Sequence, residues 1–203
     1  MSRAQTDNSY FKEKTELRIR HLPPKNKIIV LDAFAGNSKI WNKIKLESKK
    51  EIKVIGIDKK DTHNNSLKGD NIKYLKNLNL DKFDVIDLDA YGIPFEQLQA
   101  VLGRINNQIV FVTLIQSMYG AIPIKLMRQA GIPESMYKKC PSLFRNKLFE
   151  IIQGYLYKNG IRTIFLVNKG DKKYFCFCKK RIDTNDEIRD SYISSNERKS
   201  SLC

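Results

Sequence analysis

The sequence predicts an α/β fold whose central sheet is mostly parallel and ends in an antiparallel hairpin. Short apolar runs rich in β-branched residues alternate with segments whose apolar residues recur at helical spacing, the order typical of parallel strands joined by helices. The last two apolar runs break this alternation, because only a short turn at 169–172 separates them. A hairpin is therefore expected at that point.

The first half of the chain alternates strands and helices. The expected strands cover residues 28–34, 52–57, 83–88 and 108–115. The expected helices cover residues 37–48, 72–78 and 95–105. The strand runs are short and apolar enough to be buried on both faces, as in a parallel sheet. In the helix at 95–105 the apolar residues follow the helical period: Leu98, Val101, Leu102 and Ile105.

The second half begins with a mostly helical section at 123–159, interrupted at 131–133 and around Pro141. Two strands follow, at 162–168 and 173–179. We divide the chain into a basic N-terminal arm or short helix at 1–26, one domain at 27–181, and a polar, Ser-rich tail at 182–203 that we expect to be disordered.

Composition and charge limit the classes of function. A chain of 203 residues can bury the core of one domain. Its formal charge of +15 favours a polyanionic partner such as RNA, DNA or an anionic membrane surface. Together with the crevice that α/β sheets form at their carboxyl edge, the charge indicates a nucleic-acid or nucleotide partner. The oligomeric state stays open.

Apolar runs, cysteines and histidines indicate the cellular location and whether a metal site is expected. No run approaches the roughly 18 apolar residues that span a bilayer, so we expect no membrane segment. The four cysteines lack zinc or disulfide spacing, and Cys176 and Cys178 share a strand face as core residues would, which favours reduced thiols and a cytoplasmic protein. His21 and His63 are far apart, so no metal site is predicted.

The first candidate site follows the strand at 28–34, where Asp32 and Gly36 stand at a strand-to-helix turn. The turn lacks the glycine patterns that cradle pyrophosphate or triphosphate, which disfavours NAD, FAD and ATP. A ligand made of adenosine and an amino acid fits better, because Asp32 can pair with an ammonium group. Asp58, 22 positions after Gly36, can accept both hydroxyl hydrogens of a ribose. The alternative is that both carboxylates only cap turns.

These residues resemble the class I S-adenosylmethionine-dependent methyltransferases over about residues 27–180, with Leu31 to Gly36 as the first motif and Asp58 ending the second strand. The resemblance implies a three-layer, Rossmann-like, seven-stranded sheet with a C-terminal antiparallel hairpin, and S-adenosyl-L-methionine as cofactor. The residues it assigns to cofactor binding are Asp32, Phe34, Ala35, Gly36, Asp58, Asp70 and Asn71. Of the residues around the third motif, it places Asp70 near the adenine amino group and Asn71 or Ile72 beside the ring. Ser38 departs from the family, many of whose members have a second glycine there.

The second candidate site is Asp87-Leu88-Asp89-Ala90-Tyr91-Gly92, at the end of the strand at 83–88. It resembles the Asp-Pro-Phe/Tyr-Gly element of tRNA guanine-N2 dimethyltransferases and, more distantly, the Asp/Asn-Pro-Pro-Tyr/Phe element of amino-group methyltransferases. Ala90 stands in place of the usual proline. The resemblance implies that Asp89 and Tyr91 are catalytic.

The chemistry of an exocyclic amine agrees with this assignment, because its delocalised lone pair must be oriented toward the methyl group. Asp89 could accept one N–H and take the proton, and the Ala90 carbonyl could accept the other N–H. Tyr91 could stack on a base removed from its helix. Alternatively, Asp87 and Asp89 are turn residues and Tyr91 fills the surface. The loop at 116–120, with Gln116 and Met118, is a secondary candidate for shaping the substrate pocket.

The sequence therefore predicts methyl transfer to a nucleobase amine, in RNA rather than DNA. Basic residues of the arm and of the helices at 124–147 would hold phosphates without selecting a sequence. The alternatives are a DNA adenine or cytosine amino-methyltransferase, a non-catalytic nucleic-acid-binding protein with this fold, and a small-molecule methyltransferase.

Overall fold

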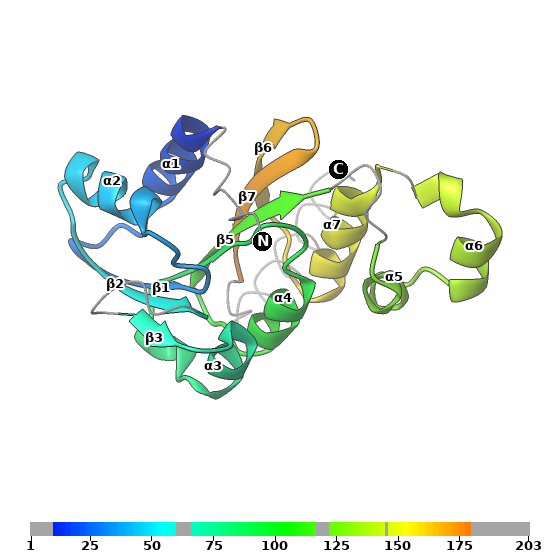
Figure 1. Cartoon of the computed structure of the whole chain (residues 1–203), viewed down its shortest axis with the longest axis horizontal. Helices are drawn as coiled ribbons and strands as arrows, with labels where there is room; N and C mark the ends of the chain where they lie inside the picture. Colours follow the sequence, from blue (N-terminus) through cyan, green and yellow to red (C-terminus); the bar gives the residue numbers. More distant parts are fainter. Residues whose placement is uncertain (1–9, 60–65, 117–121, 145, 180–203) are drawn as a thin grey trace, which may run out of the picture.

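The computed structural model describes residues 10–59, 66–116, 122–144 and 146–179. In these residues seven strands form one sheet in the order β3-β2-β1-β4-β5-β7-β6 (Figure 1). The strands are β1 (Lys27–Asp32), β2 (Glu51–Asp58), β3 (Ser66–Lys68), β4 (Val85–Asp89), β5 (Ile109–Ile115), β6 (Ile164–Lys169) and β7 (Lys172–Cys178). Among these seven strands, β7 alone runs in the opposite direction, and it pairs antiparallel with both of its neighbours, β5 and β6. The predicted α/β sheet and its C-terminal hairpin are confirmed.

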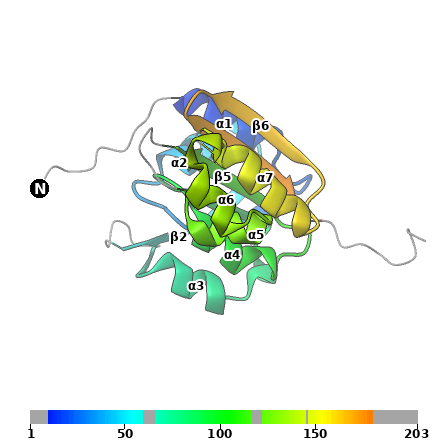
Figure 2. The ribbon, with the colours of Figure 1, turned by 90° about the vertical axis from the view of Figure 1, so that its right-hand side faces the viewer.

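Helices cover both faces of this sheet, which gives three layers (Figure 1). The helices are α1 (Phe11–Arg20), α2 (Lys39–Glu47), α3 (Asn71–Asn77), α4 (Phe95–Leu102), α5 (Ile124–Ala130), α6 (Glu134–Lys139) and α7 (Leu148–Lys158). Two 3-10 helices are η1 (Leu80–Lys82) and η2 (Pro141–Phe144). α1 and α2 pack on one face, and α3, α4, α5 and α7 contribute to the core on the other. Figure 2 shows α5, α6 and α7 from their outer side.

Alternation along the strands divides the core between the two faces, because successive side chains of a strand point in opposite directions. Val30 packs beside α1 and α2, whereas Leu31 packs on the opposite face. On β7, Cys176 packs toward α1 and α2, as the shared strand face predicted, and Cys178 is half-buried at the strand end. Each central strand is thus buried on both sides.

Several strand and helix ends differ from the expected ones by two or three residues. The first strand ends at Asp32 instead of residue 34, because the chain turns there toward α2. α2 begins at Lys39, two residues later than expected, and α4 ends at Leu102, three residues earlier. β3 was not located from the sequence, since its three residues contain only one apolar side chain. The helical section at 123–159 divides near the expected interruptions into α5, α6, η2 and α7.

The range that we assigned to a basic arm contains α1. Leu17 is buried in the core on the α2 side of the sheet, and α1 also contacts β7. Residues 1–9 and the tail at 182–203 lie outside the described part of the chain. In that described part, no helix combines the length and the apolar character needed to cross a membrane.

Candidate active site

The turn between β1 and α2 is held close to the end of β2. Gly36 has a positive φ of 46°, and its N–H donates to Oδ2 of Asp58 at 2.9 Å. Gly56 lies beneath the turn, where an added Cβ would come within 2.6 Å of the Ala35 Cβ. Ser38 takes a φ of 50°, the left-handed conformation that glycine adopts without cost. The turn therefore keeps a glycine-like backbone at Ser38 without a glycine there.

A first cavity of about 310 Å³ opens beside this turn. Its lining residues come from the ends of β1 and β2 and the loops around them: Ala33, Phe34, Ile57, Asp58, Lys59, Gly69, Asn71 and Tyr91. Asn71 is fixed in place, because its Nδ2 donates to the Ala33 carbonyl at 2.9 Å and its Oδ1 accepts from Gln97 at 3.1 Å. A half-buried carboxylate and an oriented amide thus border a partly apolar space.

Asp70 has a different environment from its neighbour Asn71. Its side chain is the N-cap of α3 and accepts a hydrogen bond from the Ile72 N–H at 2.8 Å. Asp70 is exposed and does not line the first cavity. A role beside adenine stays a prediction.

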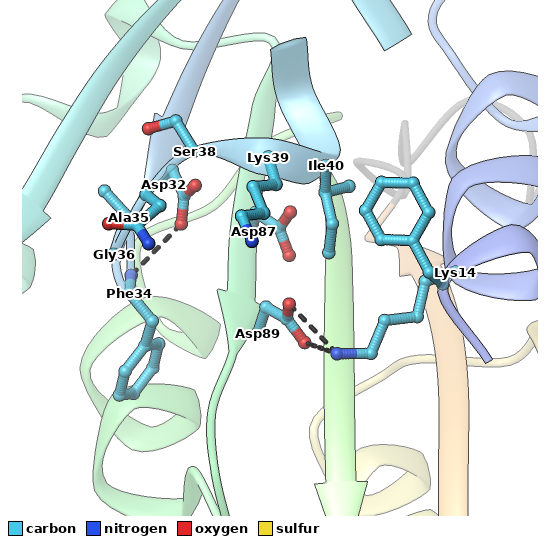
Figure 3. Close-up of a pocket in the computed structure, with 12 residues that line it drawn as sticks. Lys14, Asp32, Phe34, Ala35, Gly36, Ser38, Lys39, Ile40, Asp87 and Asp89 are labelled. Carbon is cyan, nitrogen blue, oxygen red and sulfur yellow. Dashed lines mark hydrogen bonds and ion pairs between the residues drawn. The ribbon is translucent and has the colours of Figure 1, made fainter. Parts of the chain in front are cut away.

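A second cavity of about 90 Å³ shares Phe34 with the first and is lined by three carboxylates (Figure 3). Asp32 ends β1, and Asp87 and Asp89 lie at the end of β4, with Asp32 and Asp87 directly paired in register. Its lining is completed by α1 and the turn: Phe11, Lys14, Phe34, Ala35, Gly36, Asn37, Ser38, Lys39 and Ile40. The structure thus brings Asp32 and the Gly36 turn of the first predicted site into one cavity with Asp87 and Asp89 of the second, whereas Asp58, Asn71 and Tyr91 line the other cavity.

Asp32 is buried, and one of its oxygens accepts a hydrogen bond from the Phe34 N–H at 3.1 Å. Burial raises the pKa of Asp32 well above its ordinary value, and the nearby charge of Asp87 adds to the rise. A cationic ligand would stabilise the charged form of this carboxyl group, because an ammonium group offsets the cost of burying the negative charge.

Asp87 anchors α1 to the sheet. The Arg18 guanidinium donates to both Asp87 oxygens, with Nε–Oδ2 and Nη2–Oδ1 distances of 2.8 and 2.7 Å. Trp41 donates its indole N–H to the same carboxylate at 2.8 Å. Burial lowers the pKa of Arg18, but the charge and hydrogen bonds of Asp87 outweigh burial and raise it. All three side chains are buried, so Asp87 is committed to a structural ion pair.

Asp89 has a different cation. The Lys14 ammonium donates to its two oxygens at 2.8 and 3.1 Å (Figure 3). Burial would raise the pKa of Asp89, but the positive charges of Arg18 and Lys14 outweigh burial and hold it below its ordinary value. Asp89 is therefore an ionised hydrogen-bond acceptor at neutral pH.

Tyr91 and Gln116 lie apart from these carboxylates. Tyr91 is 81% exposed and lines the first cavity, not the one that contains Asp89. Gln116 directly follows β5 and accepts a hydrogen bond from the Leu148 N–H at 3.4 Å, at the start of α7. The rest of the loop at 116–120, including Met118, lies outside the described residues.

Sequence reasoning missed the contribution of α1. Phe11, Lys14 and Arg18 lie in the segment expected to be a basic arm or short helix, which was given no part in the site, and Trp41 was expected only as an apolar helix residue. The available signal was the spacing of Lys14 and Arg18, which places both on one helix face. Their partners are 75 and 69 positions away in the sequence, so the pairing itself carried no local signal.

Comparison with solved structures identifies the fold as that of class I S-adenosylmethionine-dependent methyltransferases. A Listeria monocytogenes protein assigned to that class matches with a TM-score of 0.55 and 15% identity over 88% of this chain and 62% of its own. A Bordetella parapertussis protein described as exported matches at 0.55 and 11% over 85% of this chain and 68% of its own. A Haemophilus influenzae protein assigned as a methylase matches at 0.50 and 11% over 86% and 99%. No family model matches the sequence, and no curated protein does.

Proposed function

We propose that this chain is an S-adenosylmethionine-dependent methyltransferase that modifies an amino group of a nucleobase, in RNA rather than DNA. The observation that carries the proposal is the position of Asp89. This carboxylate lies at the carboxyl end of β4 and shares a cavity with Asp32 and the Gly36 turn. Ligands of open α/β sheets bind at this edge.

The residues present suit the cofactor. In this proposal the first cavity holds the adenosine part, with Asp58 toward the ribose hydroxyls and Asn71 beside the base. Asp32 faces the amino-acid part, where a cationic ammonium would satisfy the buried carboxylate. Phe34, Ala35 and Gly36 form the backbone between the two cavities. When bound, S-adenosylmethionine supplies an activated methyl group on a cationic sulfur.

Asp89 would orient the target amine and then take its proton. The methyl group would come from the bound cofactor, whose sulfur would keep the electron pair of the broken bond, so this chain's residues would only have to orient the amine and accept its proton. The nitrogen then releases one proton to the Asp89 carboxylate, which passes it to solvent. A methylated exocyclic ammonium on an aromatic base is a stronger acid than a carboxylic acid, because losing its proton restores delocalisation into the ring, so a carboxylate of lowered pKa is still an adequate acceptor. Tyr91 would stack on the exposed base from the rim.

A nucleic-acid substrate is supported by charge. The net charge of +15 favours a polyanion, and exposed basic residues lie on α5 and α6. The preference for RNA rests on the likeness of the element at 87–92 to the one in tRNA-modifying enzymes. The Ala90 carbonyl would accept the second N–H of the amine in place of the proline residue's carbonyl.

The test is transfer of radiolabelled methyl groups from S-adenosylmethionine to total RNA, genomic DNA and a small-molecule extract in parallel. Nuclease digestion then identifies the modified nucleoside. We expect label in RNA, on an exocyclic amine. Label only in DNA or only in small molecules would show that the substrate is of that class and not RNA. Cofactor binding without label in any pool would contradict the enzymatic role.

Two substitutions separate catalysis from cofactor binding. We expect Asp89→Ala to lower transfer by about 100-fold or more while cofactor affinity stays within about twofold, because Asp89 faces the substrate. Asp58→Ala should instead weaken cofactor affinity first. Asp81→Ala is the matched control, since Asp81 is exposed in η1, before β4 begins. Full activity of the Asp89→Ala protein would exclude the proposed mechanism.

A further inference from the structure

The N-terminal helix α1 supplies a side chain to the candidate active site. Its position is fixed by Arg18, which pairs with Asp87 and whose guanidinium lies 5.4 Å from the centre of the Phe111 ring. Arg18 also donates through Nη1 to the Lys14 carbonyl at 3.1 Å, one helical turn earlier. The buried anchor therefore determines where Lys14 lies relative to β4.

Lys14 reaches from α1 across the cavity to Asp89 (Figure 3). Its ammonium contacts both carboxylate oxygens and lies 5.4 Å from the centre of the Tyr174 ring. The Lys14 and Asp89 side chains are only 12% and 18% exposed, so solvent screens this pair less than the surface pairs. By contrast, Lys12 on the same helix is 84% exposed, and among the described residues its ion pair is with Glu16.

The charges around Asp89 come from several elements. Arg18 and Lys14 face it from α1, Asp32 from β1, and Asp87 from its own strand. Lys39, at the start of α2, lines the same cavity. Because Arg18 is committed to Asp87, Lys14 is the cation that contacts Asp89 directly. Without it, Asp89 would be a largely buried acid with no cation of the described residues in direct contact, beside the buried carboxyl groups of Asp32 and Asp87.

We propose that Lys14 is a positioning residue for Asp89, holding the carboxylate charged and oriented so that it accepts the N–H of the target amine. This inference rests on the function proposed above. A carboxylate has about four lone-pair sites, so two contacts from Lys14 leave acceptor capacity for the substrate. A protonated Asp89 would present a donor instead and could not take the proton after methyl transfer.

The direct test is the titration of Asp89 in the full chain, followed by its carboxyl ¹³C signal and assigned by comparison with Asp89→Asn. We expect Lys14→Met to raise the pKa of Asp89 by about one unit or more, because burial and the neighbouring carboxylates then dominate. Lys14→Arg should keep it below its ordinary value. Lys12→Met, on the same helix, should leave it unchanged. An unchanged titration in Lys14→Met would overturn the proposal.

Kinetics provide the second readout. On the substrate pool that wild type labels, we expect Lys14→Met to lower kcat by about tenfold at neutral pH, with the acid limb of its pH profile moved upward and KM little changed. Lys14→Arg should restore the position of the acid limb. An unmoved acid limb would indicate a merely structural role, and a raised kcat would mean that Lys14 restrains Asp89 instead. If wild type transfers no methyl group, the proposed function fails while the titration still tests Lys14.

Discussion

Three aspartates share one cavity, and each has a different partner. Asp32 accepts a backbone N–H, Asp87 receives the Arg18 guanidinium and the Trp41 indole, and Asp89 receives the Lys14 ammonium. The three carboxyl groups therefore differ in how readily they ionise, because a cationic partner stabilises the charged form whereas burial opposes it. Asp87 is therefore structural, and in the proposed function Asp32 and Asp89 would meet a cationic ligand and an amine.

Asp32 should lower stability at neutral pH, because its pKa is raised chiefly by burial. A carboxyl with a higher pKa in the folded state binds its proton more tightly there, so stability falls as pH rises from the ordinary value of about 3.9 through the raised value. The amide of Asp32→Asn does not titrate, so the variant does not lose stability in this way as pH rises. We expect this variant to be more stable than wild type by on the order of 1 kcal/mol at about pH 8, or about 2–4 °C in Tm.

Thermal unfolding at about pH 8 and about pH 5, with and without S-adenosylmethionine, tests this expectation. The gain in Tm should shrink at the lower pH, where wild-type Asp32 retains its proton more of the time. Added cofactor should stabilise Asp32→Asn less than wild type, because an amide cannot pair with an ammonium as a carboxylate does. Asp81→Asn serves as the exposed control. A lower Tm for Asp32→Asn at the higher pH would show that the charged carboxylate stabilises the fold.

At the scale of elements, the buried Arg18–Asp87 ion pair anchors α1 to the sheet. We expect Arg18→Met to lower the free energy of unfolding by about 3–5 kcal/mol, because it leaves the Asp87 charge buried and unpaired. The double variant Arg18→Met/Asp87→Leu should recover much of this loss. Urea unfolding measures both, with Lys12→Met as the control on the same helix, expected within about 0.5 kcal/mol of wild type. Equal losses in the single and double variants would argue against charge burial as the cause.

The elements also show what the sequence could predict. Apolar runs and helical spacing located six of the strands to within a few residues, because an apolar run bounded by turn residues is recognisable locally. β3 escaped because its pairing with β2, not its composition, makes it a strand. α1 was recognised only as basic, since a buried Arg18 resembles a solvated arginine until its partner is known. The cavity joining Asp32 to Asp89 required the register of β1 and β4.

At the scale of the whole molecule, some basic side chains already pair with carboxylates and others are left to bind a polyanion. On α5 and α6, Arg128 and Lys138 both pair with Glu134, whereas Lys125 and Lys139 are exposed on the same helices without an ion pair to any described residue. Figure 2 shows these helices side by side on the outer side of the molecule. A phosphate backbone would gain most from the lysines that no carboxylate already neutralises.

The double variant Lys125→Ala/Lys139→Ala should therefore bind RNA more weakly and with less dependence on salt. If each lysine neutralises one phosphate of a single strand, the slope of log K against log salt should become smaller by about 1.4. Lys27→Ala is the control, because Lys27 pairs with Glu51 at the amino end of β1, away from the carboxyl edge of the sheet. Fluorescence anisotropy across a salt series measures the slope. An unchanged slope would move the RNA path away from α5 and α6, whereas a loss of cofactor affinity in the same variant would indicate altered folding instead of lost phosphate contacts.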